Sequence, residues 1–100
     1  MQRIHFCSGS VFVTGDRIAT SLLQHVRAVA MMRRSEVLDV PVQTASGSVG
    51  TVTLLLNEAV QISAESMEPG PAELEDELFV RDVDARTADL LAAEVWTGTD

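Results

Sequence analysis

The chain has 100 residues, which is enough for one compact domain and too few for two. Fifteen acidic residues against seven arginines give a formal charge of −8, which opposes binding to the phosphate backbone of a nucleic acid. With 46% hydrophobic and 22% charged residues, the composition is that of a folded protein. We therefore expect one domain over residues 1–100 and no nucleic-acid partner.

The acidic residues are concentrated in the second half of the chain. Residues 1–50 hold five Arg and three acids, whereas residues 51–100 hold two Arg and twelve acids. The single cysteine, Cys7, has no partner for an intramolecular disulfide, which favours a reducing compartment. No apolar run has the length of a signal peptide or of a membrane span. We expect a cytoplasmic protein that does not enter a membrane.

Residues 1–43 predict a hairpin, a long helix and a strand. Gln2–Cys7 and Ser10–Thr14 are short runs rich in β-favouring residues, and Ser8-Gly9 between them suits a tight turn. Over 16–34 the apolar residues recur at the spacing of one helix face, namely Ile18, Leu22, Val26 and Val29. Thr14 or Asp16 is expected to cap this helix.

Residues 44–67 complete the expected sheet. Val37–Gln43 alternates apolar and polar residues, and Pro41 favours an edge position for that strand. Thr51–Leu56 is strongly β-favouring and predicts a second hairpin with it. The alternation from Val60 to Ala64 predicts a third strand of that meander, with a short helix as the alternative.

Residues 68–71 read as a connector because of Pro69, Gly70 and Pro71. An acidic amphipathic helix is expected over 72–93, with Leu78, Val83 and Leu90 among its apolar residues, and a tail over 94–100. The order ββ-α-βββ-α predicts an α+β fold with a mainly antiparallel sheet and two helices packed on one face. The uncovered face or edge of such a sheet favours a homodimer.

Three residues of the first half are the candidates for chemistry. His5 and Cys7 lie two apart on an expected strand, and His25 lies on the apolar side of the helix. Together they could activate a thiolate or hold a metal, whereas the alternative is that they are ordinary core residues. The usual hydrolase, metalloprotease and nucleotide-binding motifs are not present in the sequence, and we expect no metal or other cofactor.

The acidic second half offers a surface for a partner. Its expected partner-binding residues are Glu73, Glu75, Asp76, Glu77, Asp82 and Trp96. A helix with this many acids is usually a solvated face, and the alternative is a site for a basic protein. Trp96, the single Trp, either packs on the domain or anchors a contact between chains.

Gly9–Asp16, Val40-Pro41-Val42 and Thr53–Leu56 resemble segments of short actinobacterial proteins of unknown function. The resemblance covers most of the chain and implies a bacterial cytoplasmic setting, but no activity.

The sequence thus favours a small non-catalytic protein that acts through protein contacts as a homodimer. The alternative is a small-molecule-binding protein or enzyme, with His5, Cys7 and His25 lining a pocket between the N-terminal hairpin and the first helix.

Overall fold

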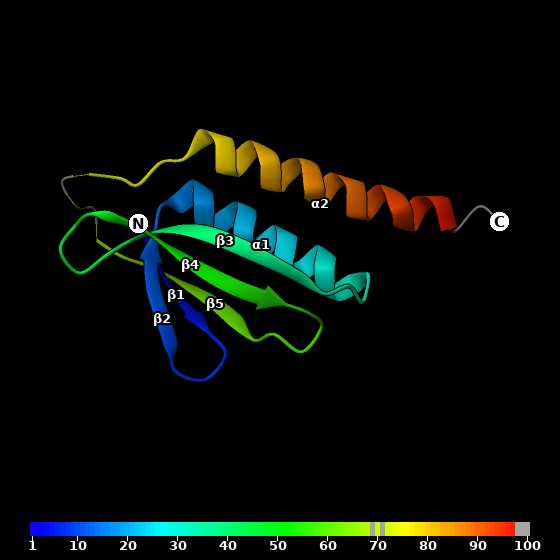
Figure 1. The fold of residues 1–100 in the computed structure, drawn as a ribbon, viewed down its shortest axis with the longest axis horizontal. Helices are drawn as coiled ribbons and strands as arrows, with labels where there is room; N and C mark the ends of the chain where they lie inside the picture. Colours follow the sequence, from blue (N-terminus) through cyan, green and yellow to red (C-terminus); the bar gives the residue numbers. More distant parts are fainter. Residues whose placement is uncertain (69, 71, 98–100) are drawn as a thin grey trace.

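A computed structural model describes residues 1–68, 70 and 72–97 of the chain. These residues form a β-β-α-β-β-β-α succession, which confirms the α+β class (Figure 1). The elements are β1 (Gln2–Phe6), β2 (Ser10–Thr14), α1 (Asp16–Met31), β3 (Glu36–Gln43), β4 (Val49–Leu56), β5 (Ile62–Ser66) and α2 (Glu77–Thr97).

All strand pairs are antiparallel, and the spatial order is β4-β3-β2-β1-β5. Both expected hairpins are present, with Phe6 opposite Ser10 around the first turn and Gln43 opposite Val49 before the second. The expected meander is wrong, because β5 pairs with β1 and not with β4. Local alternation predicts a strand but does not say which edge of the sheet it joins.

Pro41 is not on an edge strand, contrary to the expectation, because β3 lies between β4 and β2. β3 pairs with β2 only at Val13 and Gln43 among the described residues. The two hairpins therefore diverge beside Pro41, where continued pairing would require a backbone N–H that proline lacks. On this side the Thr14 hydroxyl donates to the Pro41 carbonyl at 2.7 Å.

Helix α1 is capped differently from the expectation. Gly15 is the N-cap residue and has no side chain that could accept a capping hydrogen bond. The hydroxyl of Thr14 donates instead to a carbonyl of β3. The amide of Asp16 instead donates to Glu73 Oε2 at 2.5 Å, from the segment that precedes α2. At the other end Arg33 has a positive φ of 51° and the amide of Arg34 donates to the Val29 carbonyl at 3.0 Å, a Schellman-type ending. The helix therefore ends before the two arginines.

Helix α1 lies between the sheet and α2, with both helices on one side of the sheet (Figure 1). Its predicted apolar stripe is fully or almost fully buried, at Ile18, Leu22, Val26 and Val29. A second buried row consists of Ser21, His25 and Ala28, and it contacts α2. Small and polar side chains on that row let the two helices approach closely.

Helix α2 begins at Glu77, five residues later than expected, and runs to Thr97 in the expected tail. Asp76 sets this start, because its Oδ1 accepts from the amide of Phe79 at 3.0 Å, as an N-cap carboxylate does. Its core-facing residues are Val80, Val83 and Leu90. Leu78, which the sequence groups with the apolar face, is 77% exposed.

Candidate functional site

The structure does not bring His5, Cys7 and His25 together. His5 is exposed on β1, and its Nε2 lies 3.2 Å from Glu65 Oε1 on β5. Cys7 is exposed in the first turn with a positive φ of 55°. A groove of about 460 Å³ beside Cys7 is lined by the first hairpin, β4 and the loop after it, with no residue from α1. The expected pocket between hairpin and first helix is therefore not built from these residues.

His25 is fully buried and links three elements. Its Nε2 donates to Glu36 Oε1 on β3 at 2.8 Å, and its Nδ1 lies 3.0 Å from the hydroxyl of Thr87 on α2. Arg86 Nη2 also donates to Glu36 Oε1, at 3.0 Å. Buried polar groups of this kind need such partners, because an unpaired imidazole in the core is costly.

Hydroxyl, imidazole and carboxylate stand here in the order of a nucleophile–base–acid relay. However, the Thr87 hydroxyl lies within a helix and contacts the Val83 carbonyl at 3.0 Å. The imidazole is closed to solvent. We interpret this network as the polar link that fixes α2 against α1 and β3.

Three of the proposed partner-binding acids hold the two helices in place. The Glu73 carboxylate accepts a hydrogen bond from the first backbone amide of α1, and Asp76 caps α2. Glu77 Oε2 accepts from Arg17 Nη1 at 2.7 Å, which joins the first turns of the two helices. This hydrogen bond lowers the pKa of the Glu77 carboxyl and raises that of the Arg17 guanidinium.

The remaining candidates of that set are less engaged. Glu75 is exposed, and Asp82 is 3.8 Å from Arg86 in an exposed pair on one helix face. Such exposed pairs contribute little to stability. Trp96 lies outside the residues whose side chains are described, so its predicted role stays a prediction.

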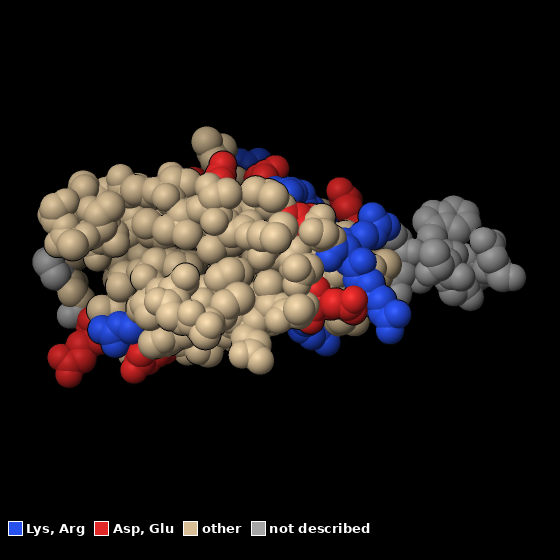
Figure 2. Space-filling model, turned by 60° about the horizontal axis from the view of Figure 1, so that its bottom comes forward, with Lys and Arg blue, Asp and Glu red and all other residues tan. Residues whose placement is uncertain are grey.

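The largest unoccupied surface is the outer face of the sheet, on the side away from both helices. The alternate residues of β3 and β4 point there, and four apolar side chains on this face are more than half exposed, namely Val11, Val37, Val49 and Leu55. Val37 lies opposite Leu55, which joins two of them into one patch. Figure 2 shows a broad central area of uncharged residues on this side, with charged residues gathered towards its ends.

The charged side chains of the outer face have local hydrogen-bond partners. Arg3 Nη1 contacts Glu65 Oε1 at 3.2 Å, and the adjacent His5 shares that oxygen. Hydrogen bonds from His5 and Arg3 lower the pKa of Glu65. On β3, Asp39 Oδ1 accepts from the Thr53 hydroxyl at 2.6 Å. The outer face therefore combines exposed apolar groups with one carboxylate, that of Asp39, which has no ion pair among the described residues.

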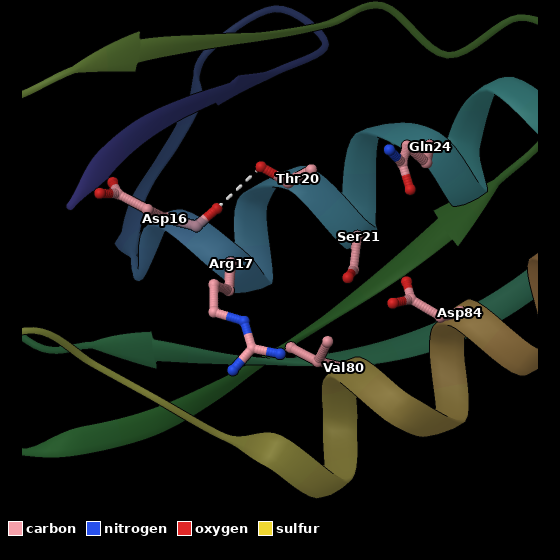
Figure 3. Close-up of a pocket in the computed structure, with 7 residues that line it drawn as sticks. All are labelled: Asp16, Arg17, Thr20, Ser21, Gln24, Val80 and Asp84. Carbon is pink, nitrogen blue, oxygen red and sulfur yellow. Dashed lines mark hydrogen bonds between the residues drawn. The ribbon is translucent and has the colours of Figure 1, made fainter.

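A second hollow lies between the two helices on the other side of the molecule (Figure 3). It measures about 350 Å³ and is lined by Asp16, Arg17, Thr20, Ser21, Gln24, Val80 and Asp84. The Asp16 carboxylate points away from it and accepts from Gln2 Nε2 at 3.0 Å. We call this hollow the interhelical cleft.

In the described part of the chain, no group of three or more His, Cys, Asp or Glu side chains could hold a metal ion. Neither helix, over its described residues, combines the length and apolar character needed to cross a membrane. The chain matches no protein-family model, no curated protein and no solved structure.

Sequence reasoning anticipated an uncovered sheet face or edge at Val37–Gln43, where Val37 alternates with the buried Leu38, Val40 and Val42. It did not anticipate the exposed apolar side chains of Val11, Val49 and Leu55 on the same face. The interhelical cleft had no signal, since its lining comes from two helices that meet only in the folded chain.

Proposed function

We propose that this protein acts through protein–protein contacts and that its outer sheet face joins two copies of the chain into a homodimer. The observation that carries the proposal is the exposed apolar patch on that face, with Leu55 at 56% and Val37 at 62% exposure. Exposed apolar patches of this kind on a folded protein are typical of interaction surfaces.

Charge favours a second copy as the occupant. With a formal charge of −8, two copies repel one another wherever their acidic surfaces meet. The acids before and along α2 lie on the opposite side of the molecule from the outer face (Figure 1). Two outer faces can meet without bringing these acids together.

The size of the face suits a dimer. Strands of five to eight residues, at about 3.3 Å per residue and about 4.8 Å between strands, give five strands a projected area of roughly 500 Å². Side-chain relief adds accessible area to that projection. A specific interface buries about 800 Å² on each partner, so the face supplies a large share of it.

The exposed edge of β4 borders the outer face. β4 is the last strand on its side of the sheet, and an eight-residue strand there presents unpaired backbone groups. Leu55 and Val49 stand beside that edge on the outer face. Stacked sheets lie about 10 Å apart, so these backbone groups stay at the margin of a face-to-face dimer and do not pair across it.

The cytoplasmic setting belongs to the same proposal. Its support is a lone cysteine that is exposed as a free thiol, a state that a reducing compartment maintains.

Sedimentation velocity of the wild type and two matched variants tests the proposal. Leu55→Arg places a charge in the patch, and Leu78→Arg places the same charge at a more exposed leucine on α2. We expect a dimer for wild type and for Leu78→Arg at micromolar concentration, and a monomer with an unchanged circular-dichroism spectrum for Leu55→Arg. A monomeric wild type, or equal dissociation by both variants, would overturn the proposal.

A further inference from the structure

The interhelical cleft holds opposite charges that do not meet. Arg17 on α1 and Asp84 on α2 both line it, yet no ion pair forms between them in the described residues. Figure 3 shows the guanidinium and the carboxylate on either side of Ser21. Asp84 makes no hydrogen bond or ion pair in the described part of the chain, which leaves its carboxylate able to accept.

Ser21 lines the floor of the cleft and offers its hydroxyl to a ligand. The residue is 3% exposed, and its hydroxyl points across the cleft towards Asp84 (Figure 3). Among the described residues it has no side-chain hydrogen-bond partner. No fully buried side-chain nitrogen or oxygen lacks a partner in the described residues, so this hydroxyl faces the open space of the cleft and is available to a ligand. Beside it Val80, 6% exposed, supplies an apolar wall.

We propose that the interhelical cleft binds a small zwitterion that carries an ammonium and a carboxylate group, of the class of free α-amino acids. Asp84 and the Ser21 hydroxyl accept hydrogen bonds from the ammonium. The guanidinium of Arg17 donates to the carboxylate through N–H groups that Glu77 leaves free, since an Arg has five such donors. Val80 contacts the carbon atoms between them.

Other ligand classes fit the lining less well. A simple anion meets the carboxylates of Asp84 and Glu77 near the one guanidinium. A simple amine is repelled by the positive charge of Arg17. A divalent cation is repelled in the same way, and the cleft lacks the several carboxylates that such a cation needs. The volume of about 350 Å³ lies at the small end of the range for ligand sites.

Chemical-shift titration of the full ¹⁵N-labelled chain tests this site. The probes are L-alanine and L-serine, and the separate halves of the zwitterion, ethylamine and acetate. We expect saturable shifts for an amino acid at the amides of residues 17–24 and 80–84, with affinity at least about tenfold above that for either half. Shifts that do not saturate, or an ethylamine affinity equal to that of the amino acids, would overturn the proposal.

Matched variants complete the test. Asp84→Asn removes the charge from the cleft, and Asp82→Asn removes an exposed charge of the same helix outside it. We expect Asp84→Asn to weaken amino-acid binding about tenfold or more, with Asp82→Asn unchanged. The spectra of the two variants report at once that both are folded. Retained affinity in Asp84→Asn, or an equal loss in Asp82→Asn, would refute the site.

Discussion

The two faces of the same sheet carry similar apolar residues with opposite fates. On β4 the neighbours Leu55 and Leu56 have the same side chain, but Leu56 is fully buried under the helices and Leu55 is 56% exposed. The same alternation on β3 buries Val40 and exposes Val37. Equally apolar side chains therefore stabilise the chain on the inner face and remain exposed to solvent on the outer face.

Exchanging each of these leucines for alanine gives the largest contrast. We expect Leu56→Ala to lower the free energy of unfolding by about 3 kcal/mol, because it removes a fully buried side chain and leaves a cavity. Leu55→Ala should change the stability of the monomer little and weaken the dimer. Urea unfolding at low protein concentration measures the first effect, and its concentration dependence measures the second. Equal losses in the two variants would contradict the distinction between the faces.

A substitution at Gly15 tests how tightly the chain packs on the helix side of the sheet. A Cβ at this position would overlap the carbonyl oxygen of Leu74, although the local backbone suits any residue with φ at −70°. We expect Gly15→Ala to cost about 2 kcal/mol, since backbone atoms of the segment before α2 must shift. Thermal unfolding measures the loss.

Gly47 provides the control for Gly15. It has open space around its Cβ position, but its φ of +86° adds backbone strain of about 1 kcal/mol on substitution. A smaller loss in Gly15→Ala than in Gly47→Ala would show that the close approach of Leu74 is unimportant.

The smallest expected effect concerns the charges between the helices. Arg17 lowers the pKa of Glu77 below its ordinary value of 4.5, so the folded chain binds fewer protons there than the unfolded chain. The resulting stabilisation is present above pH 4.5 and is lost as the pH falls through the lowered pKa.

Arg17→Gln should therefore be slightly less stable than wild type at pH 7, and the difference should shrink below pH 4.5. Urea unfolding at several pH values follows it, with Arg27→Gln, an exposed arginine of the same helix, as control. A difference that grows towards acid pH would mean that the sign is wrong. The effect is small because both side chains are open to solvent.

Patterns local in sequence anticipated most of the elements. The stripe of Ile18, Leu22, Val26 and Val29 predicted α1, because apolar spacing at the helix period marks a buried face. The same reasoning located α2 but placed its start at residue 72, directly after the connector, whereas the cap residue Asp76 sets the start at Glu77. The exposure of Leu78 was missed because its position on the helix is clear only once α1 is in place.

The candidate sites were less accessible to sequence reasoning. The expected cluster of His5, Cys7 and His25 failed because strand and turn geometry place the first two on exposed surfaces, away from the buried histidine. The partner-binding acids were read as a free surface, yet Glu73 and Glu77 contact α1 in space. The second result depends on contacts between residues more than 50 positions apart.

By itself the sequence determined the class of fold, the acidic character and the order of elements, because these follow from composition and from periods of two and 3.6 residues. Only the tertiary structure decided that β5 joins β1, that Glu73 caps α1, and that α2 covers Ser21 and His25. These pairings are chosen by which surfaces fit when the whole chain packs, and no local spacing records that choice.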